Sequence, residues 1–242
     1  MSNNPITDSL VEAARQLRGS VDRLRFKQPV AHVYNPLDYA WSAHQAYLCH
    51  AGGSRKRVVF LGMNPGPFGM VQTGVPFGEI NAVCDWMKIE AHIDRPRNAH
   101  PKRPVEGFAC RRSEVSGRRL WALFADRYDR AEGFFADHFV ANYCPLAFFD
   151  AEGRNLTPDK LPSLQAKALF DACDRHLRRV VEILHPEWVI GIGEFAGKRA
   201  RHVFSAGLPK IGRILHPSPA SPAANRDWAQ KATAQLEALG VW

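Results

Sequence analysis

Four short apolar runs, separated by stretches of helical periodicity, constrain the fold of this chain more than any other feature. They occupy residues 57–62, 139–141, 188–192 and 211–215. Short runs rich in β-branched and other apolar residues are typical of buried strands. Helical patterns between such strands favour a parallel sheet with helices on both faces. We therefore expect an α/β fold, a three-layer α/β/α sandwich around a central, mainly parallel four-stranded sheet.

Helices are predicted before, between and after these runs. Thr157 and Pro158 have the residue types of an N-cap and a first helical residue. No internal repeat, low-complexity linker or shift in composition divides the chain, so we expect a single domain over residues 1–242. The predicted helices cover residues 8–27, 36–49, a helix or helix pair beyond Thr157 that extends to Leu184, a helix that begins near Glu194, and a closing helix that ends at about Leu239.

The loop that follows the first run has an unusual composition. Residues 62–79, GMNPGPFGMVQTGVPFGE, contain five glycines, three prolines and two phenylalanines, with the amide of Asn64 at the mouth of the loop. Glycine allows backbone to approach a ligand closely, and proline makes a loop rigid. This composition favours a close-fitting pocket over a packed core.

Three polar side chains are predicted to meet at one edge of the sheet. Asn64 follows the first run, Asn142 ends the second and His216 follows the fourth. In an open parallel sheet, ligands bind beyond the carboxyl ends of the strands. An Asn after a strand is by itself typical of a turn, and a His before Pro is typical of a surface position. Three such residues at one edge indicate a ligand site instead.

Charge and cysteine content narrow the class of partner. The formal net charge of +8 favours an anionic partner, a nucleic acid or a membrane surface. The sequence has no apolar stretch long enough to span a bilayer and no signal peptide, which favours an intracellular protein that binds nucleic acid in the cytoplasm, nucleoid or nucleus. Its five cysteines are scattered without a CxxC pair, so we expect reduced thiols and no metal site.

Motifs of several other enzyme classes do not occur in the sequence. There is no evident Ser/His/Asp or Cys/His arrangement, no GxSxG and no P-loop. Residues 191–197 have a GxGxxxG spacing that differs from the GxGxxG dinucleotide fingerprint, and they follow the third run instead of the first. We interpret them as a tight turn between a strand and a helix, and we predict no cofactor.

Six motifs resemble those of a known family. They are residues 62–79 as quoted above, HPKRPV at 100–105, SEVSG at 113–117, NYCPL at 142–146, GRNLTP at 153–158 and HPSP at 216–219. At these residues the chain resembles the single-strand-selective monofunctional uracil-DNA glycosylases, a branch of the uracil-DNA glycosylase superfamily. The resemblance covers most of the chain from about residue 30. The iron–sulfur branches of that superfamily need four placed cysteines, which this chain lacks.

The resemblance implies a uracil-DNA glycosylase-like fold and a monomeric, cofactor-free DNA glycosylase. Such an enzyme hydrolyses the N-glycosidic bond of uracil, and of 5-substituted uracils such as 5-hydroxymethyluracil, in single- and double-stranded DNA and so initiates base excision repair. Two alternatives remain open at this point. One is a relative that excises other deaminated bases, hypoxanthine or xanthine, and the other is a basic damage-binding module that lacks the reaction.

Catalytic roles follow from the resemblance and from side-chain chemistry. Asn64 would hold the attacking water, and His216 would donate a hydrogen bond to uracil O2 and stabilise the departing anion. An amide is no general base, so catalysis would depend on positioning. No Lys lies in these motifs to form a Schiff base, which favours a hydrolase without strand cleavage. The protonation state of His216 stays open.

Base recognition is assigned to five residues in the same way. Asn142 would offer an acceptor and donors to the N3–H and O4 edge of uracil, a pattern that cytosine reverses. Phe77 would lie flat against the flipped base. Gly66 stands where the main uracil branch carries a Tyr that excludes a 5-methyl group, and Met70 is expected beside it. The backbone of Met63 would contact the base.

DNA contacts are expected from the loop after His216 and from a basic loop earlier in the chain. Vertebrate members of the family carry Arg-Asn after HPSP, where this chain has Ala220 and Ser221, so the preference for single or double strands stays open. Ser218 is expected to bind phosphate through its hydroxyl and its backbone N–H. The DNA-binding candidates are Pro217, Ser218, Pro219, Ala220, Ser221, Lys102 and Arg103.

Overall fold

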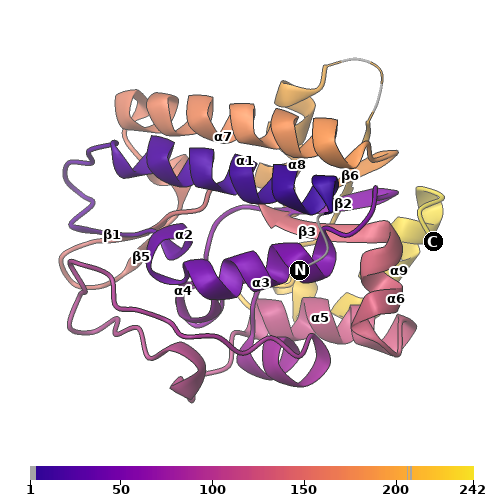
Figure 1. The fold of residues 1–242 in the computed structure, drawn as a ribbon, viewed down its shortest axis with the longest axis horizontal. Coiled ribbons are helices and arrows are strands. Elements are labelled where there is room, and N and C mark those ends of the chain that lie inside the picture. The colour runs from indigo at the N-terminus through magenta and orange to yellow at the C-terminus, as the bar shows by residue number, and fades with distance from the viewer. Residues whose placement is uncertain (1–3, 206, 208) are drawn as a thin grey trace.

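The centre of the fold is a four-stranded parallel sheet (Figure 1). A computed structural model describes residues 4–205, 207 and 209–242 of the chain. The strand order is β3-β2-β6-β7, and all three pairings are parallel. The four strands match the four apolar runs and confirm the predicted sheet. Their bounds are β2 Val58–Gly62, β3 His138–Asn142, β6 Trp188–Ile192 and β7 Lys210–Ile214.

The register of these strands brings their carboxyl ends to one edge. Gly62 lies opposite Asn142, and Ile192 lies opposite Ile214. All five residues of β2 are buried, because the strand has a neighbour on each side and helices on both faces. The loops that leave the sheet at this edge therefore start from positions fixed by backbone hydrogen bonds.

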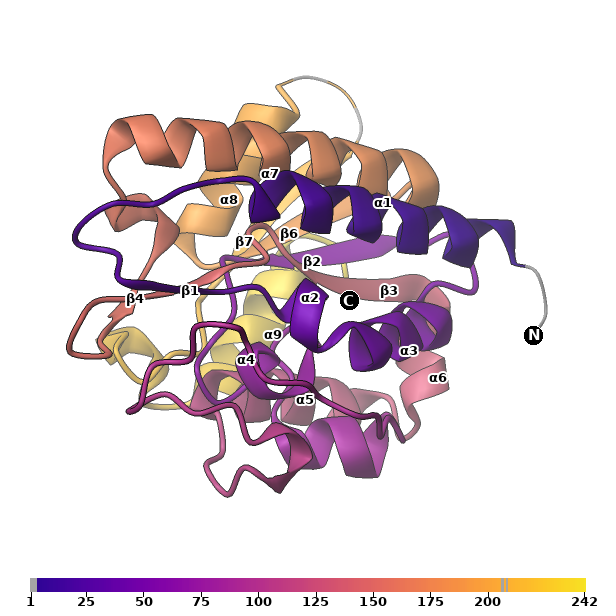
Figure 2. The same cartoon turned by 60° about the vertical axis from the view of Figure 1, so that its left-hand side comes forward.

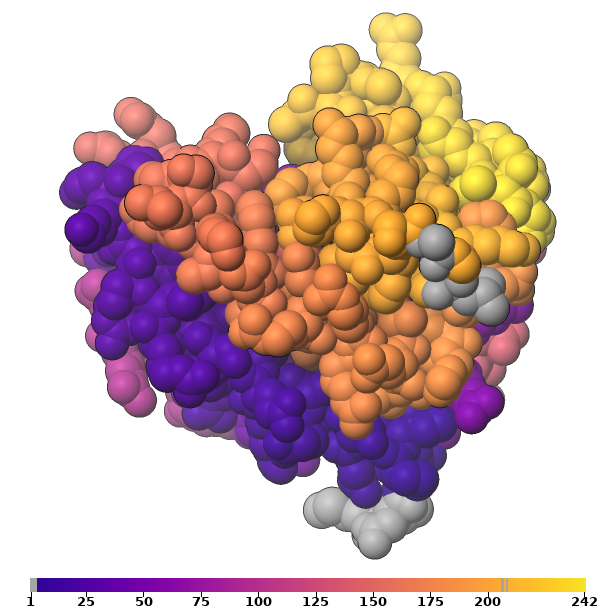
Figure 3. Space-filling view, turned by 90° about the horizontal axis from the view of Figure 1, so that it is seen from above, coloured from indigo at the N-terminus to yellow at the C-terminus, as the bar shows by residue number. Residues whose placement is uncertain are grey.

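Helices cover both faces of the sheet and confirm the α/β/α sandwich (Figures 1 and 2). On one face, α1 (Pro5–Asp22) packs along α7 (Ser163–Leu184), and Figure 3 shows the two side by side. Helix α8 (Glu194–Val203) lies on the same face, against β6 and β7. Within the described residues, no helix combines the length and the apolar character needed to cross a membrane. The other face carries α3 (Trp41–Ala51), α5 (Val115–Arg127), α6 (Ala131–Asp137) and α9 (Trp228–Ala238).

A second, three-stranded sheet was not predicted from the sequence. Its strands, β1 (His32–Tyr34), β4 (Ala147–Phe149) and β5 (Asn155–Leu156), pair antiparallel in the order β1-β4-β5. Strands of two or three residues are too short to give an alternating pattern. This sheet holds the segment after β3 beside the edge where the parallel strands end.

Three predicted helices differ from those in the structure. The helix predicted over 8–27 is α1, which ends at Asp22. The helix predicted over 36–49 is divided into α2 (Pro36–Tyr39) and α3, because the chain leaves helical geometry at Ala40. Thr157 precedes only a short 3₁₀ helix, Pro158–Lys160, and α7 begins at Ser163 after a further proline. Other short helices are α4 Met70–Thr73, a π-helix Ala82–Trp86 and 3₁₀ helices Gly107–Ala109 and Pro222–Ala224.

The predicted tight turn at residues 191–197 is confirmed as a close contact between β6 and α8. A Cβ added to Gly191 would lie 2.5 Å from Cα of Gly197, which is backbone and cannot rotate away. By contrast, Gly19 lies in α1, and no described atom outside its own helix backbone would lie within 4 Å of a Cβ there.

Gly191→Ala should therefore destabilise the protein by about 1–3 kcal/mol, because α8 must move off the sheet. Gly19→Ala is the matched control and should stabilise the protein by about 0.5–1 kcal/mol, since alanine is the better helix former. Urea unfolding of the three proteins measures both changes. Equal stability of Gly191→Ala and the wild type would show that the contact between β6 and α8 is not tight.

Candidate active site

A cavity of about 410 Å³ lies at the carboxyl edge of the parallel sheet. It contains the three strand-end residues Asn64, Asn142 and His216, so the predicted convergence of these side chains is present in the structure. A cavity of this size is in the range of small-molecule sites. Its lining consists of Met63, Asn64, Pro65, Gly66, Pro67, Phe77, Glu114, Ser116, Asn142, Asn155, Thr157, His216 and Ser218.

The amide of Asn64 is held by the segment that follows β3. Its Nδ2 donates a hydrogen bond to the carbonyl of Leu146 at 3.2 Å. The two segments are also joined by backbone, since Cys144 N–H donates to the carbonyl of Met63 at 2.9 Å. The hydrogen bond to Leu146 uses the amide nitrogen, so the oxygen of Asn64 is the atom left to accept a hydrogen bond from a bound molecule.

Phe77 is held in the cavity wall by an unusual backbone conformation. Its φ of 53° lies in the left-handed region, which costs a bulky residue about 1–3 kcal/mol. Its carbonyl accepts hydrogen bonds from Trp121 Nε1 at 3.1 Å and from Glu79 N–H at 2.7 Å, which stabilise this geometry. A Cβ on Gly62 would lie 2.8 Å from Phe77 Cζ and would overlap Asn142 Oδ1. Glycine at this position therefore lets the ring and the amide come together.

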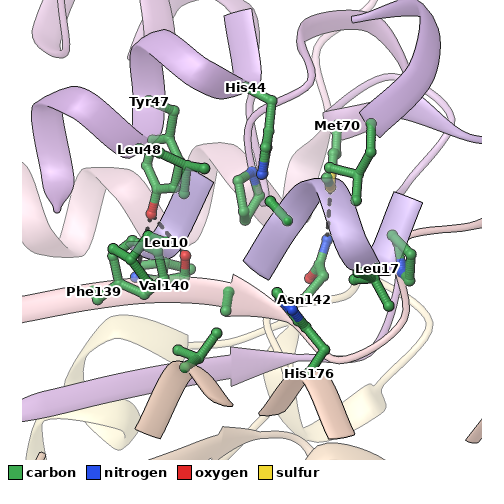
Figure 4. Close-up of a pocket in the computed structure, with 16 residues that line it drawn as sticks. Leu10, Leu17, His44, Tyr47, Leu48, Met70, Phe139, Val140, Asn142 and His176 are labelled. Carbon is green, nitrogen blue, oxygen red and sulfur yellow. Dashed lines mark hydrogen bonds between the residues drawn. The ribbon is translucent and has the colours of Figure 1, made fainter. Parts of the chain in front are cut away.

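The amide of Asn142 is oriented by a sulfur atom behind it. Its Nδ2 contacts Met70 Sδ at 3.3 Å, as the dashed line in Figure 4 marks. A thioether has no proton to donate, so this contact favours the orientation in which nitrogen faces the sulfur. Oδ1 is then buried without a hydrogen-bond partner among the described residues. Such an acceptor is ready for a donor on a bound ligand.

Met70 does not have the position that we expected from the sequence. It begins α4 and is not among the described residues that line the 410 Å³ cavity. It lines a second cavity of about 40 Å³ behind Asn142 (Figure 4). His44 and His176 line the same small cavity, and burial lowers the pKa of each to about 4. The wall behind Asn142 is therefore uncharged near neutral pH.

His216 is a neutral imidazole whose tautomer follows from its hydrogen bond. Ser218 N–H donates to Nδ1 at 3.0 Å, so Nδ1 carries a lone pair and the ring proton is on Nε2. Burial lowers the pKa of His216 to about 4. Gly193, with φ of 89°, lies directly behind the ring, and a Cβ there would lie 2.9 Å from Cβ of His216. The histidine thus offers a fixed N–H donor to the cavity.

The loop after His216 is stabilised by its own hydrogen bonds. Arg119 Nη1 donates to the carbonyl of Pro217 at 2.9 Å, and Ser218 Oγ accepts from Ala220 N–H at 3.2 Å. Pro219 and Ala220 are exposed, and Ser221 is partly exposed. The N–H of Ser218 is donated to His216 in this structure, so of the two groups that we expected to bind phosphate the hydroxyl is the one that remains to donate. The role of Ser218 in binding DNA stays a prediction.

The two basic candidates are not part of the cavity wall. Neither Lys102 nor Arg103 is among the described residues that line it. Lys102 is exposed, whereas Arg103 Nε donates to the carbonyl of Gly153 at 2.6 Å and its guanidinium lies over the ring of Phe149. Arg103 therefore joins two loops of the fold, and its role in binding DNA stays a prediction.

Several lining residues were not identified from the sequence. Glu114 and Ser116 belong to the SEVSG segment, and Asn155 and Thr157 belong to GRNLTP. Both segments were noted as motifs, but neither follows a predicted strand, so nothing in the pattern directed their side chains to the sheet edge. Within the described part of the chain, no group of three or more His, Cys, Asp or Glu side chains is arranged to hold a metal ion.

Comparisons with known proteins identify the family to which this chain belongs. The family described as the Uracil DNA glycosylase superfamily matches residues 49–237. Single-strand selective monofunctional uracil-DNA glycosylase of Rattus norvegicus is 44% identical over 98% of this chain and 86% of its own, and that of Bos taurus is 42% identical over 99% and 89%. The crystal structure of wild-type SMUG2 from Pedobacter heparinus has the same fold, with a TM-score of 0.64 at 16% identity over 94% of this chain and 98% of its own. The chain belongs to the uracil-DNA glycosylase superfamily.

Proposed function

We propose that this protein is a monofunctional uracil-DNA glycosylase that hydrolyses the N-glycosidic bond of uracil in DNA and so initiates base excision repair. One observation carries the proposal: Asn64, Asn142 and His216, from three different strand ends, line one cavity together with Phe77. The names of the relatives from Rattus norvegicus and Bos taurus support the same activity. A base must leave the duplex to enter such a cavity, so the substrate nucleotide would be flipped out.

Uracil recognition would depend on the amide of Asn142. The unpartnered Oδ1 would accept N3–H, and the second proton of Nδ2 would be donated to O4. Cytosine presents an acceptor and a donor at these positions, so it would face like groups on both. A buried polar group left mispaired costs about 1–3 kcal/mol, and rotation of the amide to suit cytosine would lose the contact with Met70. Phe77 would stack on the face of the base.

Bond cleavage would be assisted by positioned polar groups without a charged catalyst. As the C1′–N1 bond breaks, its electron pair stays with uracil, and Nε2–H of His216 would stabilise the anion at O2. The sugar becomes cationic, and a water held by the oxygen of Asn64 would add to C1′ and release a proton to solvent. No lysine is present among the cavity-lining residues of the described chain, which supports hydrolysis without a Schiff base.

The wider expectations belong to the same proposal. DNA would be the macromolecular partner, consistent with the net charge of +8, and the protein would act as a monomeric single domain over residues 1–242 wherever the cell keeps its DNA. Activity on 5-substituted uracils is included, because the family resemblance places Gly66 where the main uracil branch carries a Tyr that excludes a 5-methyl group. No cofactor is required for hydrolysis by these residues.

Asn64→Ala and His216→Ala should each lower the single-turnover rate of uracil excision by about 10²–10³-fold, because each removes a group that acts on the reacting atoms. Binding to the same oligonucleotide should persist. The measurement is incubation with a uracil-containing oligonucleotide followed by alkaline cleavage, beside titrations of fluorescent DNA. Asn81→Ala and His92→Ala replace exposed residues of the same types and serve as matched controls. Full activity in both active-site variants would overturn these roles. Excision of hypoxanthine and xanthine from matched oligonucleotides tests the alternative substrates.

In the Glu114→Gln variant, which lacks the other titratable group of the cavity, the rate of uracil excision should stay constant as the pH falls from about 8 to 5.5 and should decline only near the pKa of about 4 that burial gives His216. Below that pH the imidazole gains a proton on Nδ1, which then faces the N–H of Ser218 and loses its hydrogen bond. Single-turnover rates from pH 3.5 to 8, with circular dichroism to monitor folding, make the test. A midpoint near 6.5, the ordinary value for histidine, would contradict a neutral, enclosed His216.

A further inference from the structure

The amide of Asn142 lies between the two cavities and lines both of them. Its two polar atoms face different surroundings. A Cβ on Gly62 would overlap both Oδ1 and the ring of Phe77, so Oδ1 lies on the side of the 410 Å³ cavity. Nδ2 lies against Met70, which lines the 40 Å³ cavity (Figure 4). The 40 Å³ cavity therefore forms the surroundings of the amide that a bound base does not touch.

The described residues of the 40 Å³ cavity have no spare side-chain proton to donate to this amide. Pro76 and Pro145 lack even a backbone N–H. Tyr47 Oη donates its proton to the carbonyl of Val140 at 2.7 Å. Apart from two histidines and Met70, the other residues of the wall are aliphatic or aromatic hydrocarbons. An oxygen that faced this cavity would find no donor there among these groups.

The two histidines of the 40 Å³ cavity have lone pairs in place of free protons. His44 Nδ1 donates to the carbonyl of Gly74 at 2.8 Å, so Nε2 of this ring carries a lone pair. His176 Nδ1 is buried without a partner among the described residues, and the carbonyl of Ala13 accepts the proton of the ring. Burial lowers the pKa of each histidine to about 4, so neither gains a second proton near neutral pH.

The sulfur of Met70 is the acceptor that the amide contacts directly, at 3.3 Å from Nδ2. Met70 is 2% exposed, and its carbonyl accepts from Gly74 N–H at 2.9 Å, which holds the turn that carries it. If the amide were reversed, Oδ1 would face the sulfur, so two acceptors would oppose each other. Nδ2 would then lie against the hydrocarbon ring of Phe77. A buried polar atom without a partner is costly, so the wall favours the observed orientation.

We propose that Met70 is a positioning residue for base selection: its sulfur, in a wall whose described polar side chains offer Asn142 only acceptors, holds the amide in the orientation that binds uracil. The inference rests on the proposed function, in which Oδ1 accepts N3–H and Nδ2 donates to O4. Cytosine has a lone pair at N3 and an amino group at C4, so it needs the reversed amide. The preference for uracil is therefore set in the free protein, before any base is bound.

Met70→Leu should weaken the binding of free uracil by about three- to tenfold, because the amide loses its fixed partner and both orientations become accessible. Binding of free cytosine should stay the same or become tighter, so the preference for uracil falls. Isothermal titration calorimetry with each free base measures the two dissociation constants, and urea unfolding measures stability. Met87→Leu is the matched control, because Met87 is 1% exposed and is not among the described residues that line either cavity.

Norleucine tests the sulfur itself, since it has a methylene group in place of Sδ and keeps the shape of methionine. The wild-type chain with norleucine at its 4 methionine positions should show the same loss of uracil binding. The Met70→Leu chain made in the same way should show no loss beyond that of Met70→Leu alone. This second protein controls for Met63, which lines the 410 Å³ cavity.

Two results for Met70→Leu would overturn the inference. Equal weakening for uracil and cytosine would indicate a side chain that only fills space, and unchanged binding of both bases would show that the amide needs no sulfur. A wild-type protein that binds cytosine as tightly as uracil, or binds neither, would refute the inference whatever its activity on DNA. A wild-type protein that prefers uracil but leaves uracil-containing DNA intact would refute the proposed function alone, and the same titrations would then decide the role of Met70.

Discussion

The register of the parallel strands is the constraint on which the cavity depends. Gly62 lies opposite Asn142 in the ladder of β2 and β3, and the pairing continues past the strand, where Tyr143 N–H donates to the carbonyl of Gly62 at 2.9 Å. Beyond the pairing of β6 with β7, Gly193 N–H donates to the carbonyl of Ile214 at 2.8 Å. These hydrogen bonds fix the position along the strands at which each loop begins. A slip in either pairing would separate the groups that bind the base from the one that stabilises the leaving anion.

Close approach at this edge requires that some residues have no side chain. Gly62 admits the ring of Phe77 and the amide of Asn142, and Gly193 admits the ring of His216. The side chains held in this way lose little freedom when a ligand binds, because packing already fixes them. The left-handed φ of Phe77 is the energetic cost of the arrangement, and the hydrogen bonds to its carbonyl offset that cost.

The strands could be predicted because a buried parallel strand has a continuous apolar sequence. The convergence of Asn64, Asn142 and His216 could be predicted from the ends of these strands. The small sheet could not, since β5 has only two residues and its pattern carries no period. Met70 was placed on the wrong side because a loop sequence does not say which way a short helix turns. Glu114 precedes a helix like many other polar residues, and only the structure shows that Gly66 and Gly69 leave room for its carboxyl group beside the cavity. Roles that depend on side-chain direction are therefore the ones that sequence patterns leave open.

The two titratable groups that line the cavity, His216 and Glu114, both favour their neutral forms. Burial lowers the pKa of His216 and raises that of Glu114, so desolvation acts on both toward the neutral form. In the proposed reaction the sugar gains positive charge as the uracil gains negative charge. An imidazolium beside them would stabilise the anion but oppose the cation, whereas the N–H dipole of a neutral imidazole acts mainly on the atom it faces. A neutral donor in a dry, fixed position therefore suits a reaction that separates opposite charges within a few ångströms.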